Sequence, residues 1–152
     1  MTNLRVYLAL LLLILLSSCL GKGDGAEEPI MSAQDIETRK EEVTSAVPST
    51  IAGLKNPVPL TNESIETGRE TFNKFCSFCH GESGTGEPVF KQEGRGAFQP
   101  ADLRKWQDRS DGELFFIITN GVEGTEMLPW GDVLSERQRW DLINYIRTFE
   151  EQ

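Results

Sequence analysis

The sequence predicts an all-α domain of modest size. Two capping boxes, at residues 110–113 and 135–138, each precede apolar residues at helical spacing. No alternating apolar and polar run indicates a strand, and the sequence has no internal repeat and no glycine-rich phosphate loop. A chain of 152 residues is long enough for one such domain with additional segments.

The first helix of the domain is expected over residues 61–78, where Thr61 or Asn62 can cap its start. Gly68 lies in its middle, and a mid-helix glycine is unfavourable by about 1 kcal/mol, so it often marks a close contact between helices. One face of the expected helix is apolar and carries Ile65, Phe72 and Phe75.

Two further helices follow. The second is expected from the capping box at residue 110 through Thr119, with Asn120 and Gly121 ending it. The third begins at the capping box at residue 135. Its apolar residues follow helical spacing, at Leu142, Tyr145, Ile146 and Phe149.

The N-terminus has the order of parts of an export signal. A single positive charge, Arg5, precedes an apolar run of 11 residues at 6–16, which is too short for a membrane span of about 20 residues. Leu16-Ser17-Ser18-Cys19 resembles a bacterial lipoprotein processing site, which implies a signal peptide over 1–18 and a lipid on Cys19. Ordinary cleavage after Ser18 and an uncleaved anchor are alternatives; all three place the protein outside the cytoplasm.

Residues 19–56 are expected to be a flexible tether, with the folded domain at 57–152. Small, polar and charged residues dominate this segment and bury little apolar surface. Residues 34–43 have the composition of a short charged helix without a convincing apolar face. In the alternative, part of the segment, chiefly residues 54–60, wraps the domain.

The decisive motif is Cys76-Ser77-Phe78-Cys79-His80. C-x-x-C-H is the signature of covalent haem c attachment, in which two thiols on one turn bind the haem and the next residue ligates the iron. A structural zinc site needs four ligands, but the chain has one histidine and no other cysteine after Cys19. A thioredoxin-like pair needs a βαβ setting, and a plain disulfide leaves His80 unexplained.

Met127 is the candidate for the second axial ligand. Methionine is the usual alternative where no second histidine exists. Met1 lies in the signal and Met31 in the expected tether. Met127 lies 47 residues after His80 in a segment with glycines and a Pro-Trp pair and without helical periodicity.

From about residue 57 to 149 the chain resembles class I c-type cytochromes, of the branch grouped with the monohaem domains of cbb3-type oxidases. The matching motifs are, in order, an N-terminal helix, the haem motif with Gly81, Pro-Ala-Asp-Leu at 100–103, Ser-Asp-Gly-Glu-Leu-Phe at 110–115, a methionine loop, and a terminal helix with Trp140 and Tyr145. One departure is Leu128, which stands where the family usually has a proline directly after the methionine.

The resemblance implies the class I cytochrome c fold, with three main helices around one covalent haem and crossing N- and C-terminal helices. It assigns the helix contact to Gly68, Phe72, Leu142 and Tyr145, and it makes Pro100 the residue whose carbonyl orients His80. Four-helix-bundle cytochromes are disfavoured, because their attachment motif lies near the C-terminus.

The expected function is electron transfer, without catalysis and without a small-molecule substrate. The net charge is −9, and the chain has no basic run for nucleic acid. The acidity suits transient docking onto a basic patch of a redox partner, or serves solubility alone. A lipid on Cys19 would hold the protein on the periplasmic or extracytoplasmic side of a bacterial membrane. Leu20 is not the aspartate that retains some lipoproteins in the inner membrane, which weakly favours the outer membrane in a bacterium that has one.

The expected carrier serves a respiratory chain. The alternatives are a fixed electron-transfer subunit of a larger respiratory or dehydrogenase complex, a haem gas sensor or peroxidase, and a structural lipoprotein that uses haem for stability.

Overall fold

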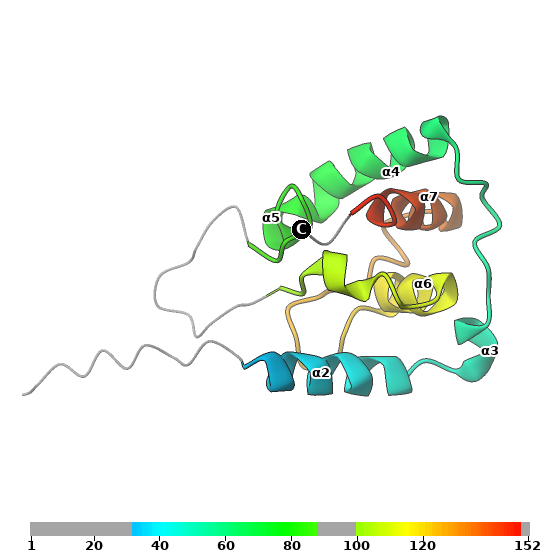
Figure 1. Cartoon of the computed structure of the whole chain (residues 1–152). Helices are drawn as coiled ribbons and strands as arrows, with labels where there is room; N and C mark the ends of the chain where they lie inside the picture. Colours follow the sequence, from blue (N-terminus) through cyan, green and yellow to red (C-terminus); the bar gives the residue numbers. More distant parts are fainter. Residues whose placement is uncertain (1–31, 88–99, 150–152) are drawn as a thin grey trace, which may run out of the picture.

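A computed structural model describes residues 32–87 and 100–149, and every regular element within these ranges is helical (Figure 1). The expected all-α class is therefore confirmed. The elements are α2 (Ala33–Ser45), α3 (Ser49–Ala52), α4 (Asn62–Phe75), α5 (Ser77–His80), the 3-10 helix η1 (Leu103–Trp106), α6 (Asp111–Asn120) and α7 (Glu136–Ile146).

Side-chain caps begin the three main helices where the sequence indicates. The Thr61 hydroxyl accepts a hydrogen bond from the amide of Ser64 at the start of α4. Complete capping boxes at Ser110 and Ser135 begin α6 and α7. Each cap satisfies amides that the first turn of a helix leaves without partners, so each fixes where its helix begins.

Helices α4 and α7 cross at Gly68. A Cβ atom at Gly68 would lie 2.7 Å from the carbonyl carbon of Asp141 and 2.8 Å from the Cβ of Tyr145, so only glycine allows this approach. Phe72 of α4 is fully buried and packs against the rings of Tyr145 and Phe149, with centroids 5.4 Å and 5.3 Å away. The expected crossing of the first and last helices of the domain is confirmed.

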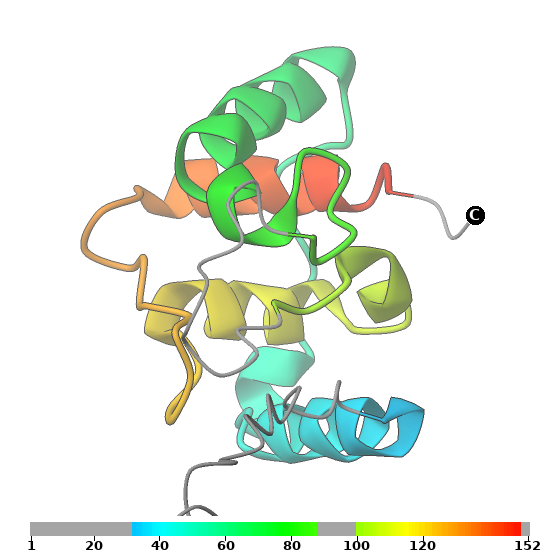
Figure 2. The same cartoon turned by 90° about the vertical axis from the view of Figure 1, so that its left-hand side faces the viewer.

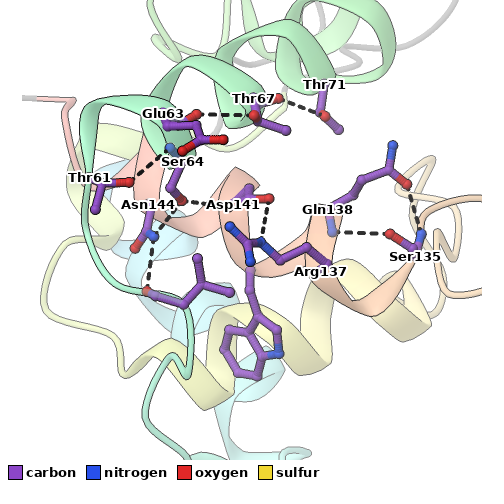
Figure 3. A network of polar contacts seen from close by, with 12 residues as sticks. Thr61, Glu63, Ser64, Thr67, Thr71, Ser135, Arg137, Gln138, Asp141 and Asn144 are labelled. Carbon is purple, nitrogen blue, oxygen red and sulfur yellow. Dashed lines mark hydrogen bonds and ion pairs between the residues drawn. The ribbon is translucent and has the colours of Figure 1, made fainter.

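A polar network lies beside this crossing (Figure 3). The Asp141 carboxylate, on α7, is almost fully buried and accepts hydrogen bonds from Ser64 Oγ at 2.5 Å and Arg137 Nε at 3.0 Å. Asn144 Nδ2 donates to Ser64 Oγ at 2.8 Å, and Asn56 Nδ2 donates to Asn144 Oδ1 at 2.9 Å. The network joins α4, α7 and the segment before α4, and it supplies the partners that buried polar groups need.

The helices are arranged in layers, with α7 between α4 and α6 and with α2 farthest from α4 (Figures 1 and 2). Phe115 of α6 stacks on Trp140 of α7 with centroids 4.0 Å apart. The buried cluster joins all three main helices and consists of Val58, Phe72, Leu114, Ile118, Leu134, Trp140, Leu142, Ile143 and Ile146.

Residues 32–56 differ from the expected flexible tether. Lys40 of α2 is buried, and its ammonium donates to the carbonyl of Lys105 at 2.8 Å and pairs with Asp108 at 3.0 Å. Ser110 Oγ donates to the carbonyl of Ala52 at 2.7 Å. Helix α3 packs on α6 so closely that a Cβ at Gly112 would collide with the carbonyl of Ile51. These long-range contacts fold the segment onto the domain, as the wrapping alternative supposed, and the wrapped part begins well before residue 54.

Within the described ranges, no helix combines the length and apolar character needed to cross a membrane.

Candidate haem-attachment site

The attachment motif forms a single turn at the end of α4. Cys76 is the C-cap of α4, and short helix α5 follows it directly. The amides of Cys79 and His80 donate to the carbonyl of Cys76 at 3.1 Å and 2.9 Å. Residues three and four apart on a turn share a face. The fold thus brings both thiols and the imidazole to one face, and Gly81 ends the turn with φ of 75°.

A backbone carbonyl orients the imidazole of His80. Nδ1 of His80 lies 3.0 Å from the carbonyl oxygen of Ala101. A carbonyl oxygen only accepts hydrogen bonds, so Nδ1 carries the proton and Nε2 keeps a free lone pair. The ring is therefore held in the tautomer that a metal ligand needs, with Nε2 as the donor atom.

The sequence-based assignment of this carbonyl to Pro100 is wrong by one residue. The acceptor belongs to Ala101, while the carbonyl of Pro100 faces Gly86, where a Cβ would lie 2.5 Å from it. The amide of Gly86 donates to the carbonyl of His80 at 2.9 Å. Because Gly86 lies against the carbonyl of Pro100, it is the carbonyl of the next residue, Ala101, that contacts the imidazole.

Asp102 stabilises the segment that presents Ala101. Its carboxylate receives two side-chain bonds of 2.8 Å from the guanidinium of Arg104, and it also accepts from the Arg104 amide. Burial alone would raise the pKa of Asp102, but these bonds outweigh it and hold the pKa below its usual value. Leu103 donates its amide to the carbonyl of Gly84 at 2.8 Å, which joins this segment to the loop after α5.

Burial shapes the protonation of all three motif residues. Burial raises the pKa of Cys76 to about 12, with a smaller contribution from Cys79. The pKa of Cys79 is also raised, first by burial and then by the charge of Glu126. Burial lowers the pKa of His80, against a smaller opposing effect of its bond to Ala101. The imidazole is thus neutral at pH 7, as metal ligation requires.

Met127 lies in a tight loop after α6. The carbonyl of Met127 accepts the amide of Val122 at 3.0 Å, and its own amide donates to Thr125 Oγ1 at 3.1 Å. The side chain is half-buried. Gly121 begins the loop with φ of 69°, and a Cβ there would collide with the carbonyl of Met127.

Two observations relate this loop to the attachment turn. The negative charge of Glu126, next to Met127, raises the pKa of Cys79, as a smaller cause than burial. The ring of Trp130 packs on Phe75, the last residue of α4, with centroids 5.5 Å apart. The sequence did not single out Ala101, Asp102 or Glu126, because their roles depend on contacts across the fold.

The residues on this turn fit haem c by the chemistry of their donors. Two largely neutral thiols flank a neutral imidazole whose Nε2 is available, and thioether formation with the haem needs thiols in this spacing. In the described part of the chain, no group of three or more His, Cys, Asp or Glu side chains could hold a metal ion by itself. Cys19 lies outside the described residues.

The comparison with protein families agrees with this site. Residues 63–146 match the model described as cytochrome c oxidase, cbb3-type, subunit III. The chain belongs to this family of class I c-type cytochromes. The cytochrome therefore has the all-α class I cytochrome c fold, and its family is one of haem c domains that carry electrons. Cytochrome c domains of this kind are typically extracytoplasmic.

One similar solved structure is a chain of the reducing HAO-like protein complex of Kuenenia stuttgartiensis. The cytochrome is 24% identical to it with a TM-score of 0.48, and the match covers 68% of the cytochrome and 50% of that chain. The cytochrome thus spans about half the length of that structure. No curated protein matches the sequence.

Proposed function

We propose that this chain is a monohaem cytochrome c that is tethered by lipid to the outer side of a bacterial membrane and carries single electrons between respiratory complexes or redox enzymes. The observation that carries the proposal is the oriented His80 on the turn with Cys76 and Cys79, with Nδ1 bound to the carbonyl of Ala101. In this proposal Cys76 and Cys79 hold one haem covalently, and His80 and Met127 are its axial ligands.

The ligand pair determines the chemistry. A haem bound by histidine and methionine exchanges one electron, and methionine raises its reduction potential. The chain fixes both ligands through the backbone: Ala101 orients the imidazole, while Val122 and Thr125 hold the backbone of Met127. Rigid ligands favour electron transfer because little needs to move when the charge changes.

The membrane attachment rests on the sequence at residues 1–19. We propose a signal peptide at 1–18, a lipid on Cys19, and a segment at 19–56 that joins the lipid to the cytochrome domain at 57–152 and packs on that domain from residue 32 onward. Helix α2 packs on the domain, so the folded part of the protein begins at Ser32. Only 12 residues lie between Cys19 and Ser32. Twelve residues span on the order of 40 Å even when fully extended. The carrier would thus work close to the membrane surface, on the periplasmic or extracytoplasmic side of a bacterial membrane.

The partners we propose are redox proteins that dock transiently, through interfaces below about 1,200 Å². A second candidate function is a fixed subunit of an oxidase or dehydrogenase complex, which the description of the matching family as an oxidase subunit favours. Purification of the membrane fraction in mild detergent separates the two. A carrier leaves as a single chain, whereas a subunit elutes with its complex.

The first experiment is spectroscopic. The haem-loaded chain should show one haem per polypeptide, a far-red methionine–iron band in the ferric state, and no response of the ferrous state to carbon monoxide. Rapid carbon monoxide binding and no far-red band would mean an open iron, contradict ligation by Met127 and favour a sensor or peroxidase. Loss of Cys19→Ala from the membrane fraction tests the lipid separately, because this variant leaves the haem site unchanged.

A further inference from the structure

Arg139 is a buried cation on the first turns of α7. It is nine-tenths buried, and in the described ranges no carboxylate forms an ion pair with it. Its Nε has no hydrogen-bond partner there. Burying a charge is unfavourable unless other contacts offset the loss of hydration. The contacts that do so for Arg139 are its hydrogen bond to Gly131 and its packing on Phe115.

The contacts of Arg139 lead to the loop of residues 121–131 after α6, which contains Met127 and is called the methionine loop below. Its Nη1 donates to the carbonyl of Gly131 at 2.9 Å. Its guanidinium carbon lies 4.8 Å from the ring centroid of Phe115, and that ring stacks on Trp140. The aromatic pair holds the guanidinium plane in place, because a planar cation stacks well on a ring. In this position the guanidinium donates its hydrogen bond to the carbonyl of Gly131 in the loop.

Gly131 is the point where the loop returns to the fold. The amides of Trp130 and Gly131 donate to the carbonyls of Ile118 and Thr119, both at 3.0 Å. These carbonyls belong to the last turn of α6, where helix carbonyls lack partners within the helix. A Cβ at Gly131 would lie 3.0 Å from the Thr119 oxygen and 3.2 Å from Arg139 Nη1. The backbone here is thus enclosed between α6 and Arg139.

This attachment point is four residues from Met127. Pro129 lies between them, and its ring restricts the backbone, so a displacement at Gly131 is passed on rather than absorbed. At its other end the loop is closed by the bond from the Val122 amide to the carbonyl of Met127. Helix α6 holds the C-terminal end of the loop through two backbone hydrogen bonds. Arg139 adds the side-chain hydrogen bond that holds this end, at Gly131.

We propose that Arg139 is a positioning residue for Met127, which keeps the methionine loop closed and the thioether available to the iron. The inference rests on the proposed ligation by Met127. It assigns Arg139 a role beyond packing: the residue sets how readily another ligand displaces methionine from the iron.

The test uses the full haem-loaded chain and the variants Arg139→Met and Arg139→Lys. The readouts are the ferric far-red band, the affinity of the ferric protein for imidazole, and the thermal unfolding midpoint. Arg139→Met should weaken the band and bind imidazole roughly tenfold more tightly, the equivalent of about 1.4 kcal/mol. Arg139→Lys keeps the charge but loses the planar fork, so its imidazole affinity should lie between those of the other two proteins.

Arg137→Met is the matched control. Arg137 lies on the same helix and pairs with the buried Asp141 carboxylate, away from the loop. This control should lower the unfolding midpoint while leaving the band and the imidazole affinity as in the unmodified protein. If Arg139→Met behaves as the control does, Arg139 is structural only and the inference is overturned.

The outcomes for the two proposals are distinguishable. A far-red band in the unmodified protein that is unchanged in both Arg139 variants refutes the positioning role and leaves ligation by Met127 intact. Absence of the band in the unmodified protein refutes the ligation itself, and the positioning role with it. If Arg139→Met does not fold, the band and imidazole affinity of Arg139→Lys decide between the same outcomes.

Discussion

A single backbone carbonyl, that of Ala101, determines what His80 can do. It accepts the Nδ1 proton at 3.0 Å and leaves Nε2 as the only nitrogen that can bind a metal. No substitution at residue 101 removes a carbonyl, so the contact is best tested through the neighbour that holds this segment in place. That neighbour is Asp102, with its paired bonds to Arg104.

Replacement of Asp102 by asparagine should destabilise the protein in a pH-dependent way. Asparagine keeps an acceptor for the Arg104 amide but loses the charge, so we expect a loss of about 1 kcal/mol at pH 7 for this partly exposed pair. The pKa of Asp102 is lowered in the folded state. Its contribution is therefore complete above the unfolded pKa of about 4, and is lost as pH falls through the folded pKa.

Urea unfolding of both proteins between pH 7 and pH 3 measures this difference. Asp132→Asn is the control, because Asp132 is exposed, and its substitution should change stability by less than about 0.5 kcal/mol. A stability difference for Asp102→Asn that stays constant down to pH 3 would contradict an electrostatic origin.

Gly68→Ala tests the helix crossing at one atom. The new methyl group would meet the backbone of Asp141, which cannot rotate away, so we expect a loss of at least about 2 kcal/mol. Gly53→Ala is the matched control, because its Cβ would lie 3.5 Å from the nearest atom at an ordinary helical φ of −76°. Equal unfolding free energies for the two variants would show that the crossing tolerates a wider separation.

Among the elements, those with local signals were predictable from the sequence. The capping boxes at Ser110 and Ser135 begin α6 and α7, because a cap involves residues only three apart. The expected helix over 61–78 is divided at Cys76, where the backbone leaves helical φ, into α4 and α5. The packing of α2 was not predictable, because it depends on Lys40 meeting Asp108, 68 residues further on.

In the site, too, the features with a local sequence signal are predictable and those that depend on tertiary contacts are not. The motif at 76–80 is local and is predictable from the sequence, whereas family resemblance assigns the carbonyl that orients His80 to Pro100 and the structure assigns it to Ala101. Which carbonyl reaches the imidazole is decided by the passage of Gly86 beside the segment at 100–103. That passage is a tertiary contact and leaves no pattern in the sequence.

Lys40→Met should release α2 from the domain. Methionine keeps the apolar stem but loses the bonds to the Lys105 carbonyl and Asp108. A buried hydrogen bond from a charged group is worth roughly 1.5 kcal/mol or more, so local opening of α2 should become about tenfold more frequent. A glutamate-specific protease measures this opening at Glu37, Glu41 and Glu42 of α2, since the substitution leaves its cleavage sites intact.

Arg39→Met serves as the comparison, because it removes a neighbouring positive charge from an exposed position of the same helix. Its cleavage rate should match that of the unmodified chain. Equal cleavage of Lys40→Met and Arg39→Met would mean that α2 is held by its other contacts.

Taken as a whole, the molecule is acidic, and its acidity extends to the site. The net charge is −9 for the full chain, and removal of residues 1–18, whose only charge is Arg5, makes it −10. The segments 75–87 and 120–133, which hold the attachment turn and the methionine loop, contain no lysine or arginine. They carry five acidic residues, all exposed: Glu82, Glu87, Glu123, Glu126 and Asp132.

This charge predicts opposite salt effects on electron transfer to small reagents of opposite sign. Oxidation of the ferrous protein by a cationic cobalt complex should slow several-fold between low and high salt, while oxidation by ferricyanide should accelerate, because salt screens attraction and repulsion alike. Stopped-flow kinetics measure the rate constant against ionic strength for each reagent, which gives two slopes. Glu126→Gln and Glu41→Gln each remove one negative charge, but of the two only Glu126 acts electrostatically on Cys79 of the attachment turn. If the field at the site governs the encounter, Glu126→Gln alone flattens both slopes; equal flattening by the two variants would instead assign the effect to net charge.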